Sequence, residues 1–210
     1  MDYVWHWAVV PVSTGGSTGV VLTAATLRPH VRLGAVTTEA WDVAEDTVLE
    51  DKIAAALRRL RGRLQREFLN TQFDFAFDRF PGGLEPIRLP RWPLVSVQSV
   101  TWYGTDGAAT VLSTSAYFVD TYSEPGRLCL KNGYTWPTGT RDQVAGVIRF
   151  TAGYGTDALG VPDPLKEAAR KLATELYENR EAVSIGNSIN EPLPYGIEEL
   201  VSEFVLPEIG

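Results

Sequence analysis

Histidine and cysteine, the side chains that most often ligate metals or act as nucleophiles, are scarce in this sequence. The chain has two histidines, His6 and His30, and one cysteine, Cys129. Neither histidine belongs to an HExxH motif, and a single cysteine excludes CxxC. We therefore expect no catalytic residue and no metal site. Cys129 stands between two leucines, which predicts a buried and inert thiol.

A glycine-rich stretch at residues 13–19 (STGGSTG) has the composition of a phosphate-binding loop. No lysine follows it, and its neighbours do not form a strand–loop–helix unit of the required length. A second pair, Gly153 and Gly155, lacks the third glycine of a dinucleotide fingerprint, because Ala158 stands in that place. We therefore interpret residues 13–19 as a flexible linker and expect no cofactor.

Two kinds of side chain leave alternatives open. Asp74 and Asp78 are spaced to share one face of a strand, where paired carboxylates could hydrolyse a glycosidic bond, but we expect both to face solvent. Six tryptophans would suit a carbohydrate-binding module or another β-rich binding domain. Trp92 and Trp136 adjoin prolines in predicted loops, which favours surfaces that contact other proteins.

The net charge of −7 is concentrated near the C-terminus. Residues 181–210 contain six glutamates and no lysine or arginine, which leaves about −1 for the rest of the chain. Tight binding to nucleic acid needs clustered cations, so this balance argues against it. The arginines of residues 58–66 form two rows, which we interpret as a solvated helix face or as partners for acids of a neighbouring subunit. Contact of these arginines with DNA phosphate is the weaker alternative.

Four helices are predicted from apolar spacing and capping residues. The clearest covers residues 44–70, where apolar side chains such as Leu49, Ile53 and Leu60 recur at intervals of three and four. Asp163 can cap a helix over 163–180, with Pro164 in the first helical position. Shorter helices are expected over 23–33, capped by Thr23, and over 195–204.

From residue 72 the apolar period changes to two, as in a strand with one buried face. Phe73, Phe75 and Phe77 alternate with Asp74, Ala76 and Asp78. Asp106-Gly107 predicts a tight hairpin turn. Strands are expected at 3–12, 72–78, 87–89, 94–103, 108–112, 117–121, 127–130 and 147–152.

These elements predict an α+β fold, a small helical bundle with an inserted antiparallel β region. The expected organisation is an N-terminal extension with a Gly/Ser linker (1–21), a helical bundle (22–71 and 160–205), a β insertion (72–159) and a C-terminal tail (206–210), with a loop at 181–194. The apolar stretch 4–12 is too short to span a bilayer and has no basic residues before it. We therefore expect no membrane association, and a protein that stays in the cytoplasm or in a particle assembled there.

Several short sequence motifs follow one another in a distinctive order. RFPGG (79–83) is followed by IRLP (87–90), PLVSV (93–97) and a hairpin at 102–107. Later motifs are YFVD (117–120), EPGR (124–127), YTWP (134–137), IRFTAGYG (148–155), VPDPLK (161–166), LYENREA (176–182) and PYGIE (194–198). These motifs and their order resemble those of the phage head–tail connector (adaptor) family, the neck-ring proteins of long-tailed phages and gene transfer agents. The resemblance covers residues 22–203.

The resemblance implies a structural protein that is not an enzyme. Twelve copies would form a ring beneath the portal, the ring would accept the stopper or next neck protein, and double-stranded DNA would pass through its centre. The C-terminal segment would reach toward the portal. The residues expected to contact partners are Tyr195, Ile197, Leu200, Phe204, Leu206, Ile209, Trp92 and Trp136.

Charged residues have an expected role in such a ring. Cationic walls would hold DNA phosphate, so we expect acids near the channel. Glu198, Glu199 and Glu203 are predicted to lie near the lumen or to pair with basic residues of the portal. Arg58 and Arg61 are the candidates for charge pairing between subunits.

Overall fold

The computed structural model describes residues 7–12, 20–34, 40–179 and 193–205. The predicted linker at 13–19, most of the predicted loop at 181–194 and the tail at 206–210 lie outside these ranges. The chain divides into two compact units: a β unit of residues 1–17 and 69–154, and a helical unit of residues 18–68 and 155–210. Helices and antiparallel strands are both present, which confirms the predicted α+β class.

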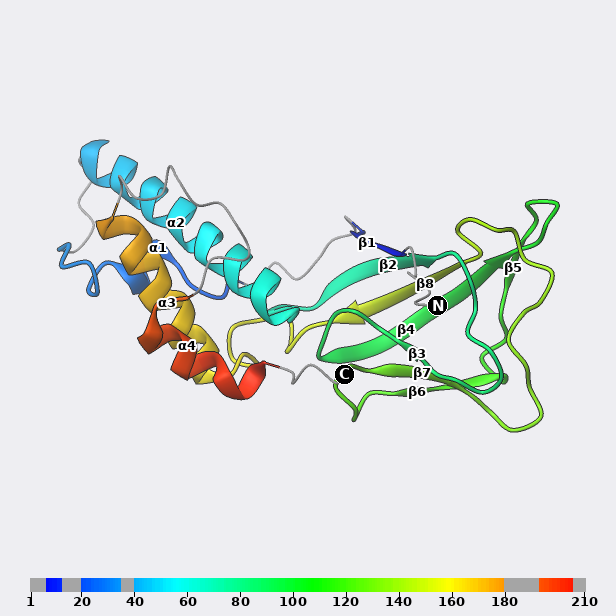
Figure 1. Ribbon diagram of the computed structural model, residues 1–210. Coiled ribbons are helices and arrows are strands. Elements are labelled where there is room, and N and C mark those ends of the chain that lie inside the picture. Colours follow the sequence, from blue (N-terminus) through cyan, green and yellow to red (C-terminus); the bar gives the residue numbers. More distant parts are fainter. Residues whose placement is uncertain (1–6, 13–19, 35–39, 180–192, 206–210) are drawn as a thin grey trace. The chain divides into compact units, whose positions relative to one another are not determined.

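Within its described residues, the helical unit contains four helices and a short 3-10 turn. They are α1 (Ala24–Leu27), α2 (Ala40–Leu64), α3 (Asp163–Glu178), α4 (Tyr195–Val201) and η2 (Ser202–Phe204). α3 packs against both α2 and α4 (Figure 1). The predicted apolar stripes form the interface, because Leu49 and Leu60 of α2 and Leu165 and Leu172 of α3 are fully buried.

Several helix ends differ from the prediction, and three of them have a local reason. α1 begins after Thr23, whose side chain accepts from the Thr26 amide as expected, but it ends at Leu27 instead of residue 33. Pro29 has no amide hydrogen to continue the helix, and the chain proceeds in turns. α2 ends at Leu64 instead of residue 70, because Gln65 adopts a positive φ of 55°. Asp163 is the first helical residue and pairs with Lys166 at 2.7 Å, while Pro162 occupies the cap.

A buried ion-pair network joins Arg28, which follows α1, to the N-terminal half of α2. The Arg28 guanidinium donates to Asp42 Oδ1 and Asp46 Oδ1, each at 2.7 Å, and to the Gly34 carbonyl at 2.9 Å. Only 4% of Arg28 and 2% of Asp42 are exposed. The hydrogen bonds to Asp42 and then to Asp46 raise the pKa of Arg28. Arg28 thus connects the turns after α1 to the first turns of α2.

In the part of the chain that the structure describes, the larger sheet of the β unit has five strands in the order β1-β2-β8-β4-β5, and every neighbouring pair is antiparallel. The strands are β1 (Trp7–Pro11), β2 (Thr71–Phe77), β8 (Gly146–Ala152), β4 (Leu94–Tyr103) and β5 (Ala109–Val111). The predicted alternation in β2 is confirmed, because Phe73, Phe75 and Phe77 are buried and the residues between them are not. Gly107 (φ 81°) forms the predicted turn between β4 and β5.

A second sheet covers the apolar face of the first. Its strands are β3 (Ile87–Arg88), β7 (Arg127–Leu130) and β6 (Tyr117–Asp120), in the order β3-β7-β6 (Figure 1). One hydrophobic cluster joins Phe150 and Ile148 of the large sheet to Leu128 and Tyr117 of the small sheet. The β unit therefore has its own core between two packed sheets.

One carboxylate organises the turn between β6 and β7. Asp120 Oδ1 accepts from the amides of Tyr122 (3.0 Å) and Ser123 (3.1 Å). Its Oδ2 accepts from Ser123 Oγ (2.7 Å) and from Arg127 Nη2 (2.7 Å) and Nε (3.1 Å). The hydrogen bond from the Ser123 hydroxyl, followed by those from Arg127, holds the pKa of Asp120 well below its usual range.

Replacing Asp120 with asparagine should make the free energy of unfolding less dependent on pH in the acid range. A carboxylate with a lowered pKa in the folded state stabilises the fold above its unfolded pKa of about 4 and loses that contribution as the pH falls toward the folded pKa. Urea denaturation at pH 7 should therefore show Asp120→Asn to be less stable than the wild type, and the difference should shrink steadily from pH 4 to pH 2. A difference that stays constant over this range would contradict the assigned role.

Candidate functional site

The C-terminal helix α4 belongs to the core of the helical unit through one face. Ile197 is 3% exposed and Val201 1%, and Leu193 just before the helix is also buried. The prediction that Ile197 contacts a partner needs correction, because its side chain already packs inside its own unit. Leu200 is half-buried on the same helix. The side chain of Tyr195, together with Leu206 and Ile209, lies outside the described part of the chain.

Phe204 is half-buried and is held by Arg66. The Arg66 Nε donates to the Phe204 carbonyl at 2.9 Å, and the guanidinium lies 5.5 Å from the centre of the Phe204 ring. This cation–π contact fixes the end of the η2 turn to the segment after α2. Phe204 therefore has a structural role before any partner binds.

The acids expected to act in the ring lie at the surface of the helical unit. Glu198, Glu199 and Glu203 are exposed, and Glu198 has one loose pairing, at 3.9 Å from Arg63. Arg58 is exposed on α2. Arg61 is less available, because its Nε donates to the Leu57 carbonyl and its Nη1 lies 3.6 Å from Glu67. The surface acids thus keep most of their capacity to pair with cations from outside.

Trp92 and Trp136, expected on exposed loops, are instead interior residues. Trp92 is 9% exposed and Trp136 is 4% exposed. The Trp136 Nε1 donates to the Glu85 carbonyl at 3.0 Å, and its ring stacks on Phe80 at 5.7 Å. These rings are not available as a flat binding platform, which also removes their support for carbohydrate binding. The proline beside each tryptophan does lie outside the named helices and strands, but other parts of the chain cover both rings.

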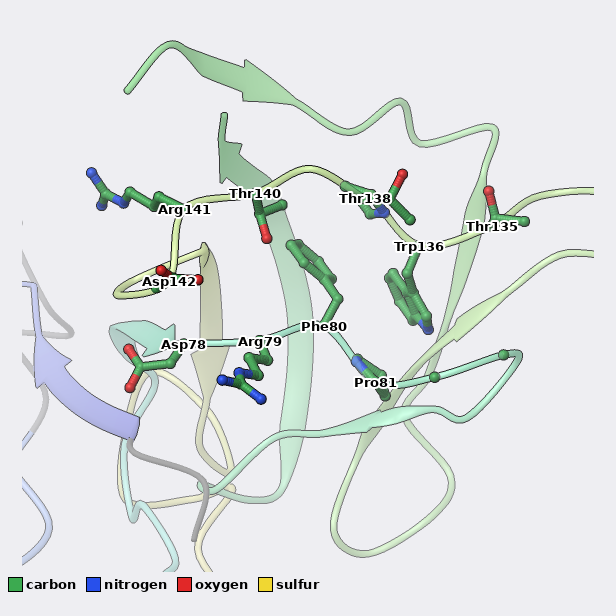
Figure 2. Close-up of a pocket in the computed structure, with 13 residues that line it drawn as sticks. Asp78, Arg79, Phe80, Pro81, Thr135, Trp136, Thr138, Thr140, Arg141 and Asp142 are labelled. Carbon is green, nitrogen blue, oxygen red and sulfur yellow. The ribbon is translucent and has the colours of Figure 1, made fainter. Parts of the chain in front are cut away.

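A groove of about 490 Å³ opens beside the buried Trp136 ring. Its walls are residues 78–83 and residues 135–138 and 140–142, from two segments far apart in the sequence. Figure 2 shows Phe80 and Trp136 side by side in this groove, with Arg79 and Asp78 on the same segment. Arg141 lies on the opposite wall, and its guanidinium covers the Tyr103 ring at 3.9 Å. The groove can accept an apolar side chain with charged neighbours, and its lining contains no histidine or cysteine.

Sequence reasoning did not predict this groove, although a signal was available. RFPGG (79–83) supplies one wall and the TWP of YTWP (135–137) begins the other. Both motifs are among those that resemble the connector family, and the fold brings them together at one surface. A motif rich in proline and glycine predicts a turn, but it does not indicate which distant segment that turn contacts.

The two aspartates considered for hydrolysis have structural partners. Asp74 forms a bidentate pair with Arg149 of the neighbouring strand β8, at 2.7 Å for both bonds. Asp78 Oδ1 accepts from the Val144 amide at 2.8 Å, where Val144 has a φ of 50°. Each carboxylate thus stabilises its own strand or loop, which weakens the hydrolase alternative.

The described residues offer neither a metal site nor a membrane-spanning helix. No group of three or more His, Cys, Asp or Glu side chains there is arranged to hold a metal ion. Within the same residues, no helix is both long and apolar enough to cross a bilayer. Cys129 is partly buried, and its burial raises the pKa of the thiol.

Comparison of the sequence with known protein families finds no match, and no curated protein matches it either. Comparison of the fold with solved structures does find similar chains. A chain in the neck of an empty gene transfer agent particle, computed with C6 symmetry, has a TM-score of 0.73 and 22% sequence identity. The match covers 96% of this chain and 97% of that chain.

Two other solved structures contain similar chains. One is the neck of a native gene transfer agent particle computed with C12 symmetry, with a TM-score of 0.71, 21% identity, and coverage of 96% of this chain and 97% of that one. The other is the virion of a native gene transfer agent particle, with a TM-score of 0.68, 24% identity, and coverage of 96% of each chain. At these identities the likeness establishes a shared fold that includes both units.

Proposed function

We propose that the chain is a structural neck protein of a phage or gene transfer agent particle, acting as the head-to-tail adaptor. Twelve copies form a ring that binds the portal on one side and the stopper or next neck protein on the other, and double-stranded DNA passes through the centre. The ring assembles in the cytoplasm of the bacterial host and remains in the particle. The observation that carries the proposal is the nearly complete match, helical and β units together, to chains from particle necks.

Two features support the proposal over an enzymatic role. The carboxylates that could have formed a catalytic pair, Asp74 and Asp78, are engaged in structural bonds. The similar neck structures were computed with sixfold and twelvefold symmetry, which suits a subunit that repeats around an axis. A ring subunit needs faces that pack on its neighbours and loops that engage unlike partners, and it needs no catalytic group.

Electron microscopy of the full chain, alone and mixed with the portal protein of the same particle, tests the proposal. We expect rings with twelvefold symmetry, at least in the mixture, and bound rings should sit on the portal. A chain that stays monomeric in both samples and does not associate with the portal would overturn the proposal. A shift of tryptophan fluorescence with glycans would instead favour the carbohydrate-binding alternative.

The exposed glutamates near the C-terminus provide a second test. We infer that Glu198, Glu199 and Glu203 line the channel or pair with basic residues of the portal, while Leu200, Phe204 and the residues around them contact the portal. The triple variant Glu198→Gln, Glu199→Gln, Glu203→Gln should reduce the joining of heads to tails, or the release of DNA, about fivefold or more at low salt. The measurement is the count of complete particles and of ejected DNA across salt concentrations.

The matched control neutralises three exposed acids elsewhere: Glu50→Gln, Glu85→Gln and Glu178→Gln. It changes the net charge by the same amount and should leave joining and DNA release near the wild-type level. Equal behaviour of the two triple variants at every salt concentration would rule out a specific role for the C-terminal acids.

A further inference from the structure

The five-stranded sheet of the β unit ends in β1 and β5, and each has one strand neighbour among the described residues. Both strands are uncharged, with the sequences WAVVP and ATV. Three large apolar side chains on these strands are exposed: Trp7 is 55% exposed, Val10 57% and Val111 64%. Monomeric proteins usually protect an edge strand with charge, an internal proline or a bulge, since open strand edges pair with other chains. Here the one proline, Pro11, stands at the end of β1.

The outer edge of β1 presents backbone groups that are not used within the sheet. The Val12 amide donates to the Gln72 carbonyl at 2.9 Å, and Val9 lies opposite Phe75 in the ladder with β2. Hydrogen-bonded positions alternate in an antiparallel pair, so residues 8, 10 and 12 bond to β2. The N–H and C=O groups of Trp7 and Val9 therefore point away from the sheet.

The outer edge of β5 has the same property. The Leu112 amide donates to the Val100 carbonyl at 2.8 Å, and the Gly104 amide donates to the Ala108 carbonyl at 3.0 Å. By the same alternation, residues 108, 110 and 112 face β4. The N–H and C=O groups of Ala109 and Val111 point outward.

The number of strands determines how two copies of this sheet could meet. With five strands and only antiparallel neighbours, β1 and β5 run in the same direction. In a ring of twelve, each copy is rotated by only about 30° from the next, so strand directions are nearly preserved between neighbours. Joining two different edges gives a head-to-tail contact, which is the kind that closes a ring.

We propose that β1 of one copy pairs with β5 of the next copy as parallel strands, so that the β units form a continuous sheet around the ring. The inference rests on the proposed ring, and the occupant of each edge is a second copy of this chain. In the favoured register Val9 lies opposite Thr110. The amides of Ala109, Val9 and Val111 then donate to the carbonyls of Trp7, Ala109 and Val9, respectively. A shift that places Pro11 opposite Thr110 loses a donor, because proline has no N–H.

Disulfide cross-linking between two variants tests the proposal directly. In a Cys129→Ser background, one chain carries Val9→Cys and the other Thr110→Cys, and the two are mixed under the conditions that give rings, with portal protein if it is required. Residues directly opposite each other in neighbouring strands are close enough for a disulfide. We expect a covalent dimer that contains one chain of each kind. As the control, Phe118→Cys replaces Thr110→Cys, because Phe118 is exposed on the edge of the other sheet. This pair should give about tenfold less covalent mixed dimer.

The outcomes separate this inference from the proposed function. Rings without the mixed cross-link would overturn the β1–β5 contact and leave the adaptor proposal standing. Cross-links only between two Val9→Cys chains would indicate a twofold contact and would also overturn the β1–β5 contact. No rings and no cross-link would overturn both.

A backbone substitution provides an independent test on β5. Val111→Pro removes one outward donor and no hydrogen bond of the β4–β5 ladder, so the chain should keep its circular dichroism spectrum and melting temperature. Loss of that bond should weaken the association of neighbouring copies about fivefold per contact. Val111→Thr keeps the donor and should assemble as the wild type does. Normal assembly of Val111→Pro, or loss only of binding to another neck protein, would overturn the pairing between copies.

Discussion

Replacing Arg28 with methionine should lower the melting temperature of the helical unit by about 10 °C. Arg28 is 4% exposed and donates hydrogen bonds to Asp42, Asp46 and Gly34. Methionine fills much of the same space but removes the guanidinium that donates to the buried Asp42 carboxylate. A buried charge that loses its partner costs far more than a surface ion pair contributes.

Two further variants isolate the cause of this loss. Arg58→Met removes an exposed arginine from α2 of the same unit and should shift the melting temperature by about 2 °C or less. Arg28→Lys keeps the charge but cannot donate in three directions from a planar group, so its melting temperature should lie between those of Arg28→Met and the wild type. Circular dichroism at 222 nm follows the melting of the helices. Similar shifts for Arg28→Met and Arg58→Met would show that the buried network contributes little.

Replacing Gly153 with alanine should destabilise the β unit by about 3 kcal/mol or more. Gly153 has a φ of 144°, which side chains rarely tolerate, and its amide donates to the Pro93 carbonyl at 2.9 Å. A Cβ atom there would lie 2.5 Å from the backbone of Leu69 and Asn70. Backbone atoms cannot move aside as the end of a flexible side chain can, so the segment before β2 would have to shift.

Gly82→Ala is the matched control for this prediction. A Cβ atom at Gly82 meets nothing within 4 Å, and its loop lies in the same unit. The control should change the free energy of unfolding, measured by urea titration and tryptophan fluorescence, by less than about 0.5 kcal/mol. Equal stability of the two variants would mean that the segment after β8 can relax at little cost.

The regular elements were predictable because their signals are local. The alternation of Phe73, Phe75 and Phe77 predicted both the strand and its buried face, and Asp106-Gly107 predicted the turn. The end of α2 was not predictable in the same way. Gln65 adopts a left-handed conformation that is usually marked by glycine or asparagine, so nothing in the sequence distinguished it from another helical residue.

The candidate surfaces depended on contacts that the sequence does not display. Trp92 and Trp136 stand beside prolines as loop residues do, yet both are buried, because burial is decided by which distant segments cover a turn. Arg28 finds its carboxylate partners 14 and 18 residues later in the chain, beyond the reach of helical spacing. The open edges of the sheet could be recognised only once the order of its strands was known.

The chain crosses between the two units three times, and this order has a consequence for synthesis. β1 leaves the ribosome well before its partner β2, which lies at residues 71–77. The β unit can close once residue 154 has emerged. By contrast, the apolar face of α2 must wait for α3, which begins at residue 163. During translation the β unit is therefore complete before the helical unit, and the side of α2 that packs against α3 stays exposed on the nascent chain until α3 emerges.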